Sequence, residues 1–164
     1  QSKIVGFFQY GSEIGPRALG HRSILADPRK KELKDFINKE IKHREEFRPF
    51  SPSVLIEHTQ EWFDCNIESP FMLFSVKCLK PELVPAIVHV DNTSRIQTVD
   101  KINNKLYYKL IEKFYNDTSV PMLLNTSFND ADSPIVETPV AAIKMFINSK
   151  IDVLILQNYI LRKI

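Results

Sequence analysis

The stretch YGSEIGPRALGHRSI, residues 10–24, combines glycines with basic side chains. All four glycines of the 164-residue chain lie within its first twenty residues, and three of them are in this stretch. Glycine tolerates positive φ and lets a backbone approach a ligand closely, and Arg17, His21 and Arg22 stand beside these glycines. A glycine-lined loop that carries guanidinium groups suits a phosphate or a carboxylate. An ordinary turn with solvated arginines explains the same residues, so this stretch alone leaves both interpretations open.

The composition is that of a globular protein, with 43% hydrophobic and 26% charged residues. We expect residues 1–164 to form a single domain with a sizeable core. The net charge of +2 argues against a dedicated nucleic-acid binder but allows a local basic patch. The sequence has no apolar run that could span a bilayer and no signal peptide, so we expect a cytoplasmic protein without a membrane partner. Because the chain begins with Gln1 and not with Met, we expect a fragment of a longer chain.

Cys65 and Cys78 are the only two cysteines. They form no CxxC pair and have no histidine at zinc-finger spacing, so we expect no structural metal. Buried free thiols in a cytoplasmic protein are the expected state of both.

Apolar strands alternate irregularly with amphipathic helices along the chain. Strands are predicted at residues 3–10, 51–56, 71–79 and 121–128, with two extended pieces around a polar turn at 86–99 and a strand or hairpin at 152–163. Helices are predicted at residues 26–47, 57–65, 104–117 and 138–149. The first helix is expected to have Asp27 as its N-cap and Pro28 at its first position, and Thr138 and Pro139 repeat this start in the last. The pattern predicts an α/β or α+β domain around a mixed sheet.

The stretch KHREEFRPFSPSVL, residues 42–55, supplies Lys42, Arg44 and Arg48 where the first predicted helix ends. Lys42 and Arg44 fall near the helix end, where cations offset the helix dipole. Arg48 lies between aromatic residues as the chain becomes apolar, and a guanidinium that enters a core needs an anionic partner. Glu45 or Glu46 could be that partner, and so could a bound ligand.

The stretch HVDNTSRIQTV, residues 89–99, places His89, Asp91 and Arg95 around a turn. A single His-x-Asp pattern is weak evidence for metal or base chemistry. A turn with solvated polar groups at a strand end explains it more simply.

The stretch LLNTSFND, residues 123–130, carries polar residues at the end of a predicted buried strand. Asn125 and Ser127 are at alternating positions, so both can face the same side of the sheet. Asn and Ser there suit recognition of a ribose, a base or phosphate oxygens. Capping of a turn by the same side chains is the alternative.

The sequence contains no Walker A sequence, GxSxG elbow, HExxH or GxGxxG motif. Neither cysteine has the sequence context of a catalytic nucleophile. Arg and Lys without a nucleophile fit catalysis by positioning and by charge neutralisation of phosphates. The residues by themselves therefore predict a domain with a polyanion site.

Four stretches in a fixed order link the chain to a known family. They are GPRALGHRSILADPR, KHREEFRPFSPSVL, HVDNTSRIQTV, and LLNTSFND followed by PIVETPVAAIKMF. Together they resemble the C-terminal domain of the O-carbamoyltransferases typified by nodulation NodU proteins and antibiotic carbamoyltransferases. The resemblance covers nearly the whole chain, and the first two motifs are long and highly specific.

This resemblance implies a YrdC-like α/β fold, with a twisted mixed sheet, flanking helices and a basic concave surface. It implies that the domain takes carbamoyl phosphate and ATP, the latter with Mg²⁺, and makes carbamoyl adenylate. A preceding N-terminal domain of actin-like fold, with its own bound metal, then moves the carbamoyl group onto a hydroxyl of the acceptor. The present chain is expected to perform only the adenylation half-reaction.

The resemblance also implies roles for individual residues. The phosphate- and nucleotide-binding cations of the family correspond to Arg17, Lys42, Arg48 and Arg95, of which Lys42 and Arg48 are expected to be catalytic, and its nucleotide-binding strand end corresponds to Asn125 and Ser127. Secondary candidates are His21, Arg22, Arg44 and His89. Where the family commonly has a glycine after NTSFN, this chain has Asp130 and then Asp132, which we leave out of the site.

A binding module without catalytic activity is the competing interpretation. YrdC-like relatives act in threonylcarbamoylation of tRNA, so a basic concavity could hold RNA or a nucleotide without catalysis. The small net charge and the few signs of exposed aromatic residues weigh against RNA. A third interpretation is a structural lobe that supports the preceding domain.

Overall fold

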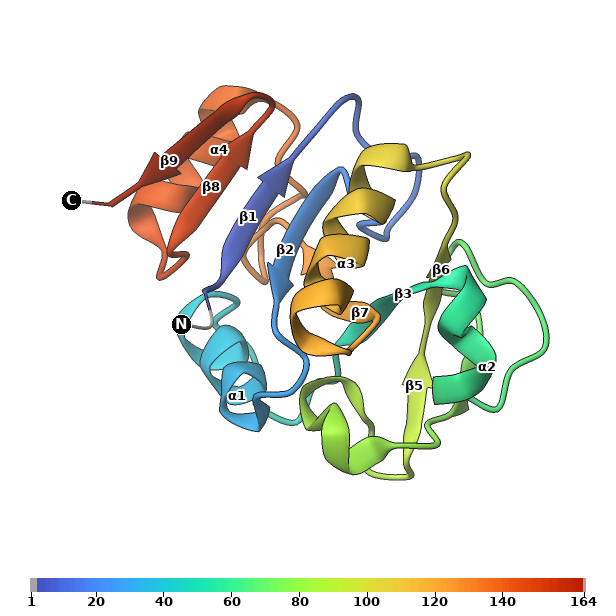
Figure 1. The fold of residues 1–164 in the computed structure, drawn as a ribbon. Coiled ribbons are helices and arrows are strands. Elements are labelled where there is room, and N and C mark those ends of the chain that lie inside the picture. Colours follow the sequence, from blue (N-terminus) through green and yellow to red (C-terminus); the bar gives the residue numbers. More distant parts are fainter. Residues whose placement is uncertain (1–2, 164) are drawn as a thin grey trace.

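A seven-stranded mixed sheet forms the centre of the protein in a computed structural model that describes residues 3–163 (Figure 1). The strand order is β6-β3-β7-β2-β1-β8-β9. In chain order, these strands are β1 (Val5–Phe8), β2 (Arg22–Ala26), β3 (Ser51–Leu55), β6 (Gln97–Val99), β7 (Met122–Ser127), β8 (Val153–Leu156) and β9 (Tyr159–Arg162). The pairs β1–β8 and β3–β6 are parallel, and the other neighbours are antiparallel. The predicted α/β class with a mixed sheet and flanking helices is confirmed.

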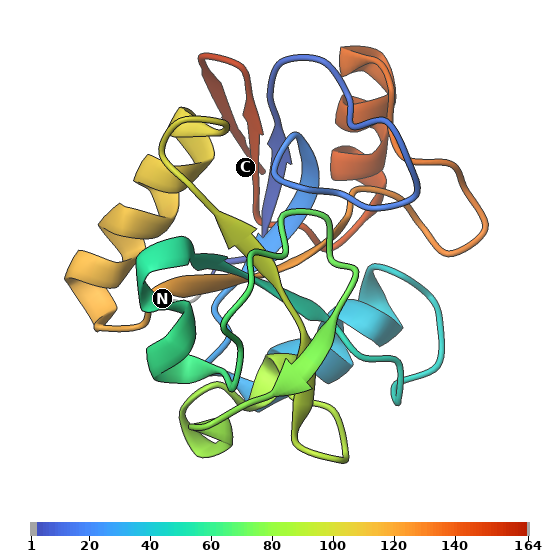
Figure 2. The ribbon, with the colours of Figure 1, turned by 90° about the vertical axis from the view of Figure 1, so that its right-hand side faces the viewer.

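Helices cover both faces of this sheet, and each face has its own apolar core. Helix α3 (Lys105–Thr118) packs on one face, and α1 (Lys31–Glu40) and α4 (Pro139–Asn148) pack on the other. Figure 2 shows α3 and α4 on opposite sides of the strands. Successive side chains of β1 point to opposite faces of the sheet, so Phe7 packs with α3 and Phe8 packs in the core on the other face.

The first predicted helix is shorter than expected and begins later. Of the residues predicted to be helical, Ala26 belongs to β2. Asp27 is not the N-cap, because the cap position is Lys30, which makes no side-chain cap hydrogen bond. The Asp27 carboxylate instead accepts hydrogen bonds from the backbone N–H and the guanidinium of Arg29. The predicted Asp–Pro helix start is therefore wrong, because the Asp27 carboxylate is occupied by its ion pair with Arg29, two residues later.

The predicted core strand at residues 71–79 is also wrong. Only β4 (Ser75–Lys77) is extended there, and it pairs with β5 (Thr93–Arg95) in a separate two-stranded sheet. Phe71, Leu73 and Phe74 are exposed, while Met72 and Cys78 are buried, so only part of this apolar run enters the core. The two extended pieces expected at 86–99 are β5 and β6, both after the polar turn, while the segment before that turn forms a 3-10 helix (Pro85–Ile87).

Most of the remaining elements agree with their predictions, but β2, in the middle of the sheet, is a strand that the sequence analysis does not predict. A 3-10 turn (Ile56–His58) and α2 (Thr59–Trp62) form the short second helix, and a 3-10 helix (Pro81–Leu83) lies between β4 and β5. Helix α3 is capped by Asn104, whose side chain accepts from the backbone N–H of Tyr107. Helix α4 starts with the predicted cap, since Thr138 accepts from the N–H of Ala141 and Pro139 follows it. The C-terminal segment is a hairpin of β8 and β9.

Candidate functional site

The glycine-rich loop between β1 and β2 is held in place by a carboxylate inside it. Glu13 Oε1 accepts hydrogen bonds from the backbone N–H groups of Leu19 at 2.6 Å and His21 at 2.7 Å. Gly20 has a φ of +107°, and a Cβ built on it would lie 2.3 Å from a ring carbon of Tyr107. A residue with a side chain is therefore excluded there by both backbone conformation and space. Because Gly20 has no side chain, the loop that carries Arg17 packs closely against Tyr107 of α3.

A row of buried polar side chains joins the same loop to the sheet. Asn125 of β7, Ser53 of β3 and Gln97 of β6 lie side by side, because β7, β3 and β6 are neighbours in the sheet. The Asn125 amide nitrogen donates to the carbonyl oxygen of Ala18 and to Ser53 Oγ, and Gln97 Nε2 donates to the carbonyl oxygen of Leu19. Buried amides that bond backbone carbonyl groups fix the position of a loop. Arg17 is thus presented from a loop anchored on both sides.

Three arginines converge beside this row on a small cavity of about 80 Å³, which we call the cation pocket. Its polar lining is formed by Arg17, Arg44, Arg95, Ser51, Asn125, Thr126 and Ser127. None of the residues that line it is an Asp or a Glu. Burial lowers the pKa of Arg95, and the nearby charge of Arg17 lowers it further. Like charges that face one cavity without a carboxylate produce a positive potential suited to an anion.

Lys42 does not itself line the cation pocket, but its ammonium contacts Ser127, which does. Lys42 is only 2% exposed. The Lys42 ammonium lies 2.8 Å from the carbonyl oxygen of Ser127, 2.6 Å from that of Asn129 and 2.7 Å from Asn129 Oδ1. Three acceptors without hydrogens suit the three donors of a charged ammonium. Burial nevertheless lowers the pKa of Lys42 to about 7, aided by the charge of Arg44 and opposed by that of Asp130.

Arg48, the other expected catalytic cation, is not among the residues that line the cation pocket. Its side chain is 52% exposed and forms an ion pair with Glu45 at 3.0 Å. The expectation that its guanidinium enters the apolar core is wrong, because the chain between α1 and β3 turns outward before Phe50. Its proposed contact with a ligand remains a prediction.

Three secondary candidates have structural partners away from the pocket. The buried Arg22 guanidinium donates to the carbonyl oxygens of Gln9 and Tyr10 and lies 3.5 Å from the centre of the Phe8 ring. His21 Nδ1 lies 3.0 Å from the carbonyl oxygen of Gly11, at the other end of the loop. His89 Nδ1 contacts Thr93 Oγ1 in the turn before β5, and burial lowers the pKa of His89. Arg44 is the secondary candidate that does line the pocket.

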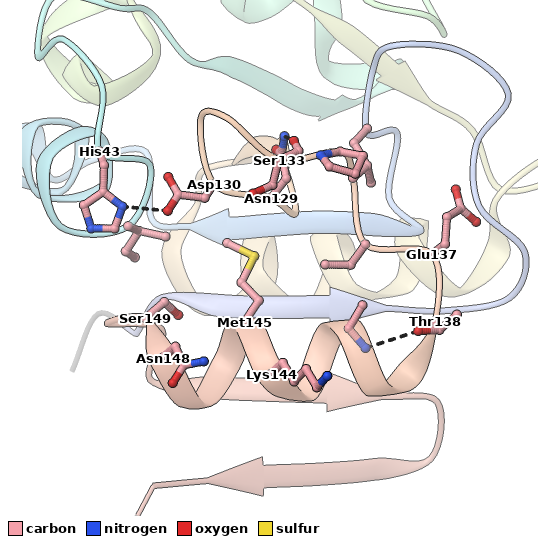
Figure 3. A pocket seen from close by; sticks show the side chains of 15 residues that line it. His43, Asn129, Asp130, Ser133, Glu137, Thr138, Lys144, Met145, Asn148 and Ser149 are labelled. Atoms are coloured by element: carbon pink, nitrogen blue, oxygen red, sulfur yellow. Dashed lines mark hydrogen bonds and ion pairs between the residues drawn. The ribbon is translucent and has the colours of Figure 1, made fainter.

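A larger cavity of about 520 Å³ is lined by Asn129, the residue whose carbonyl oxygen accepts from the Lys42 ammonium (Figure 3). Its wall is formed by the loop from Asn129 to Thr138 and by one face of α4, and Figure 3 shows Lys144, Met145 and Asn148 of that helix. His43 and Asp130 form an ion pair at its edge, 2.8 Å apart. The lining of this cavity includes Asp130 and Glu137, whereas the smaller cation pocket has no acidic lining residue, so the cation pocket suits an anion better.

Comparison with known proteins identifies the family. The sequence matches the family described as "Carbamoyltransferase C-terminus" over residues 1–163. The chain belongs to this carbamoyltransferase family. Relatives include nodulation protein NolNO of Sinorhizobium fredii and nodulation protein NolO of Bradyrhizobium diazoefficiens, each 46% identical over 98% of this chain. Nodulation protein U of Sinorhizobium fredii is 40% identical over 78% of the chain.

The chain spans 24% of the length of NolNO, 30% of NolO and 23% of nodulation protein U. The relatives are thus longer chains in which the matching region is one part. In the described part of this chain, no helix is long and apolar enough to cross a membrane.

Sequence reasoning missed three residues of the candidate site. Glu13 fixes the loop, and Ser51 Oγ lies 3.3 Å from Arg95 Nε in the pocket. Met72 lines the same pocket with a positive φ of 55°, although its neighbours on both sides are exposed. A lone carboxylate, a serine and a methionine carry no recognisable spacing signal, so only their contacts reveal them.

Proposed function

We propose that this chain is the carbamoyl-activating domain of an O-carbamoyltransferase, which binds carbamoyl phosphate and ATP and forms carbamoyl adenylate. The observation that carries the proposal is the convergence of Arg17, Arg44 and Arg95 on one pocket that has no acidic lining residue. Two unit charges ~8 Å apart repel by about 2 kcal/mol at an effective dielectric constant of ~20. A bound phosphate group removes that cost, because it supplies the missing negative charge.

The proposed reaction brings two anions together and needs no protein nucleophile. Carbamoyl phosphate loses its phosphate to water and leaves carbamate. A carbamate oxygen then attacks the α-phosphorus of ATP, and pyrophosphate leaves with the electron pair of the bond that breaks. The arginines of the cation pocket would hold the phosphates and offset the charge that develops on the leaving group. Lys42, beside the pocket, and Arg48 are the proposed catalytic cations.

Asn125 and Ser127 contribute polar groups at the end of β7. Asn125 Oδ1 is buried and accepts no hydrogen bond from the described residues, while its amide nitrogen holds the loop. A buried acceptor without a donor is costly, and an N–H group of a ligand would satisfy it. Both the carbamoyl group and adenine carry such N–H donors.

The second half of the reaction is proposed to take place outside this chain. The greater length of the relatives supports a preceding N-terminal domain that receives the carbamoyl adenylate and transfers the carbamoyl group to an acceptor hydroxyl. Mg²⁺ would arrive bound to the phosphates of ATP. The free thiols of Cys65 and Cys78 support a cytoplasmic location.

Exchange of labelled pyrophosphate into ATP tests the proposal. We expect exchange that depends on carbamoyl phosphate, because pyrophosphate is released only when carbamoyl adenylate forms. The variant R95A should lose this exchange, while R162A, which removes an exposed arginine of β9, should retain it. Absence of exchange in the unchanged protein, together with no heat of ATP binding at millimolar nucleotide, would contradict the proposed function.

A further inference from the structure

One face of the outer strands β8 and β9 has no helix on it. Figure 1 shows α4 behind β8 and β9, while α3 lies in front of the central strands and leaves the front of β8 and β9 open. Phe7, Ile155 and Ile160 are paired across β1, β8 and β9, so their side chains share this face. Phe7 is buried under α3, Ile155 is half-buried, and Ile160 is 63% exposed. The exposure of this face therefore increases from β1 through β8 to the edge strand β9.

A groove of about 520 Å³ lies where this open face meets α3. Val5, Phe7 and Ile155 of the sheet form one side, and Leu110 and Phe114 of α3 form the other. The charged residues at its ends are already paired, since Lys3 bonds Asp152 and Arg29 bonds Asp27. If another protein surface covered the groove, these charges would keep their ion-pair partners. The groove therefore suits contact with an apolar protein surface.

The pairing of the strands explains why such a surface needs cover. Strands β1 and β8 are parallel, and parallel strands are normally buried on both faces of a sheet. Apolar patches that stay open on an otherwise polar surface usually mark sites of interaction. Here α4 covers one face of this parallel pair, and on the other face α3 covers Phe7 of β1 but leaves Ile155 of β8 only half-buried.

We propose that the open face of β8 and β9, together with the groove beside α3, is the docking surface for the domain that precedes this region in the full-length protein. The inference rests on the two-part arrangement proposed above. The family description places the matching region at the C-terminus of its proteins, and the relatives contain two to three times as much chain again. That chain enters the region through β1, where Lys3 and Val5 line the groove. A domain tethered there meets the groove at a high effective concentration.

Reactivity of introduced cysteines toward a maleimide tests this assignment. The probes are I160C on the open face and L110C at the groove, each placed in the 164-residue chain and in the full-length protein. The two native thiols are buried, so the unchanged protein sets a low background. We expect both probes to react about tenfold or more slowly in the full-length protein, because a docked domain must open before the reagent enters.

The control is V140C on α4, which is 61% exposed on the opposite side of the sheet. It should react at similar rates in both proteins, which excludes a general effect of chain length. Equal rates for I160C and L110C in the two proteins would overturn the proposal. Protection of I160C in the 164-residue chain that grows with its concentration would assign the face to a second copy and overturn it too. Labelling does not depend on adenylation, so loss of pyrophosphate exchange would leave this result standing.

Discussion

The Asn125 side-chain amide donates a hydrogen bond of 3.0 Å to the carbonyl oxygen of Ala18, and these residues are 107 positions apart in the sequence. The bond connects the floor of the cation pocket to the loop from which Arg17 projects. The same amide nitrogen lies 2.9 Å from Ser53 Oγ and 3.2 Å from Gln97 Oε1. One buried side chain therefore sets both the floor of the pocket and the position of one of its walls.

Removal of this amide should affect stability and binding together. We expect N125A to lower the free energy of unfolding by about 1–3 kcal/mol, because buried partners lose their hydrogen bonds. Carbamoyl phosphate should also bind more weakly, because the Arg17 loop is less firmly held. Urea unfolding and calorimetry measure the two effects. The control N116A removes an exposed side chain of α3 and should change neither.

Arg95 should contribute strongly to anion binding. It lies in the cation pocket, and its one bonded partner among the described side chains is Ser51 Oγ. Loss of a charge-assisted hydrogen bond of about 1.5–3 kcal/mol predicts affinity for ATP that is roughly 10- to 150-fold weaker in R95A. Calorimetry measures this, with R162A as the arginine control. Unchanged affinity in a folded R95A protein would remove Arg95 from the site.

Arg48 should have a smaller effect than Arg95. Its guanidinium must leave the ion pair with Glu45 before it can contact a ligand, and part of its binding energy is spent on that exchange. We expect R48A to weaken ATP binding less than R95A does, and E45Q to strengthen it slightly because Arg48 is released. Equal losses in R48A and R95A would show instead that the ion pair does not restrain Arg48.

Gly20 should tolerate no side chain. In G20A the new methyl group would meet the Tyr107 ring in a backbone conformation with positive φ, so we expect a loss of about 1–3 kcal/mol in unfolding free energy. The matched control is G11A in the same loop, where a Cβ has no heavy atom within 4 Å. Urea unfolding of both variants checks the difference. A G20A protein as stable as G11A would contradict the packing of the loop on α3.

The charge of Lys42 should make anion binding depend on pH. Its pKa of about 7 means that the ammonium loses its proton as pH rises through 7. We therefore expect affinity for carbamoyl phosphate to fall between pH 6 and pH 9, since a positive charge beside the pocket, in contact with Ser127, is lost. The variant K42M should bind weakly and lack this fall. A K42M protein with the same pH profile as the unchanged protein would assign the titration to another group.

The same pKa sets the sign of an effect on stability. Lys42 has a folded pKa below its ordinary value of 10.5, so the unfolded chain holds this proton over a range in which the folded protein releases it. The contribution of Lys42 to the free energy of unfolding therefore rises with pH from about 7 toward 10.5. The stability difference between the unchanged protein and K42M, measured by urea unfolding at pH 7 and pH 9, should shift in favour of Lys42 at the higher pH.

The fold could be predicted where local patterns decide structure. Apolar alternation predicted β1, β3 and β7, and the Thr–Pro start predicted α4, because strand pairing and helix capping depend on neighbouring residues. The prediction of a core strand at 71–79 is wrong, because the hydrophobicity of a segment does not determine whether other parts of the fold pack over it. The prediction that Asp27 caps the first helix is wrong, because the nearby guanidinium of Arg29 bonds the Asp27 carboxylate instead.

The sequence by itself determined the carbamoyltransferase family, since the long motifs around Arg17 and Arg48 are specific in residue type and order. It also supplied the set of cations from which a site could be built. Only the tertiary structure decided which of them meet: Arg44 lines the pocket, while Arg48 turns outward to Glu45 and Arg22 is occupied by backbone carbonyls. The physical reason is that convergence depends on β6, β3 and β7 becoming neighbours, and this long-range pairing leaves no local periodicity in the chain.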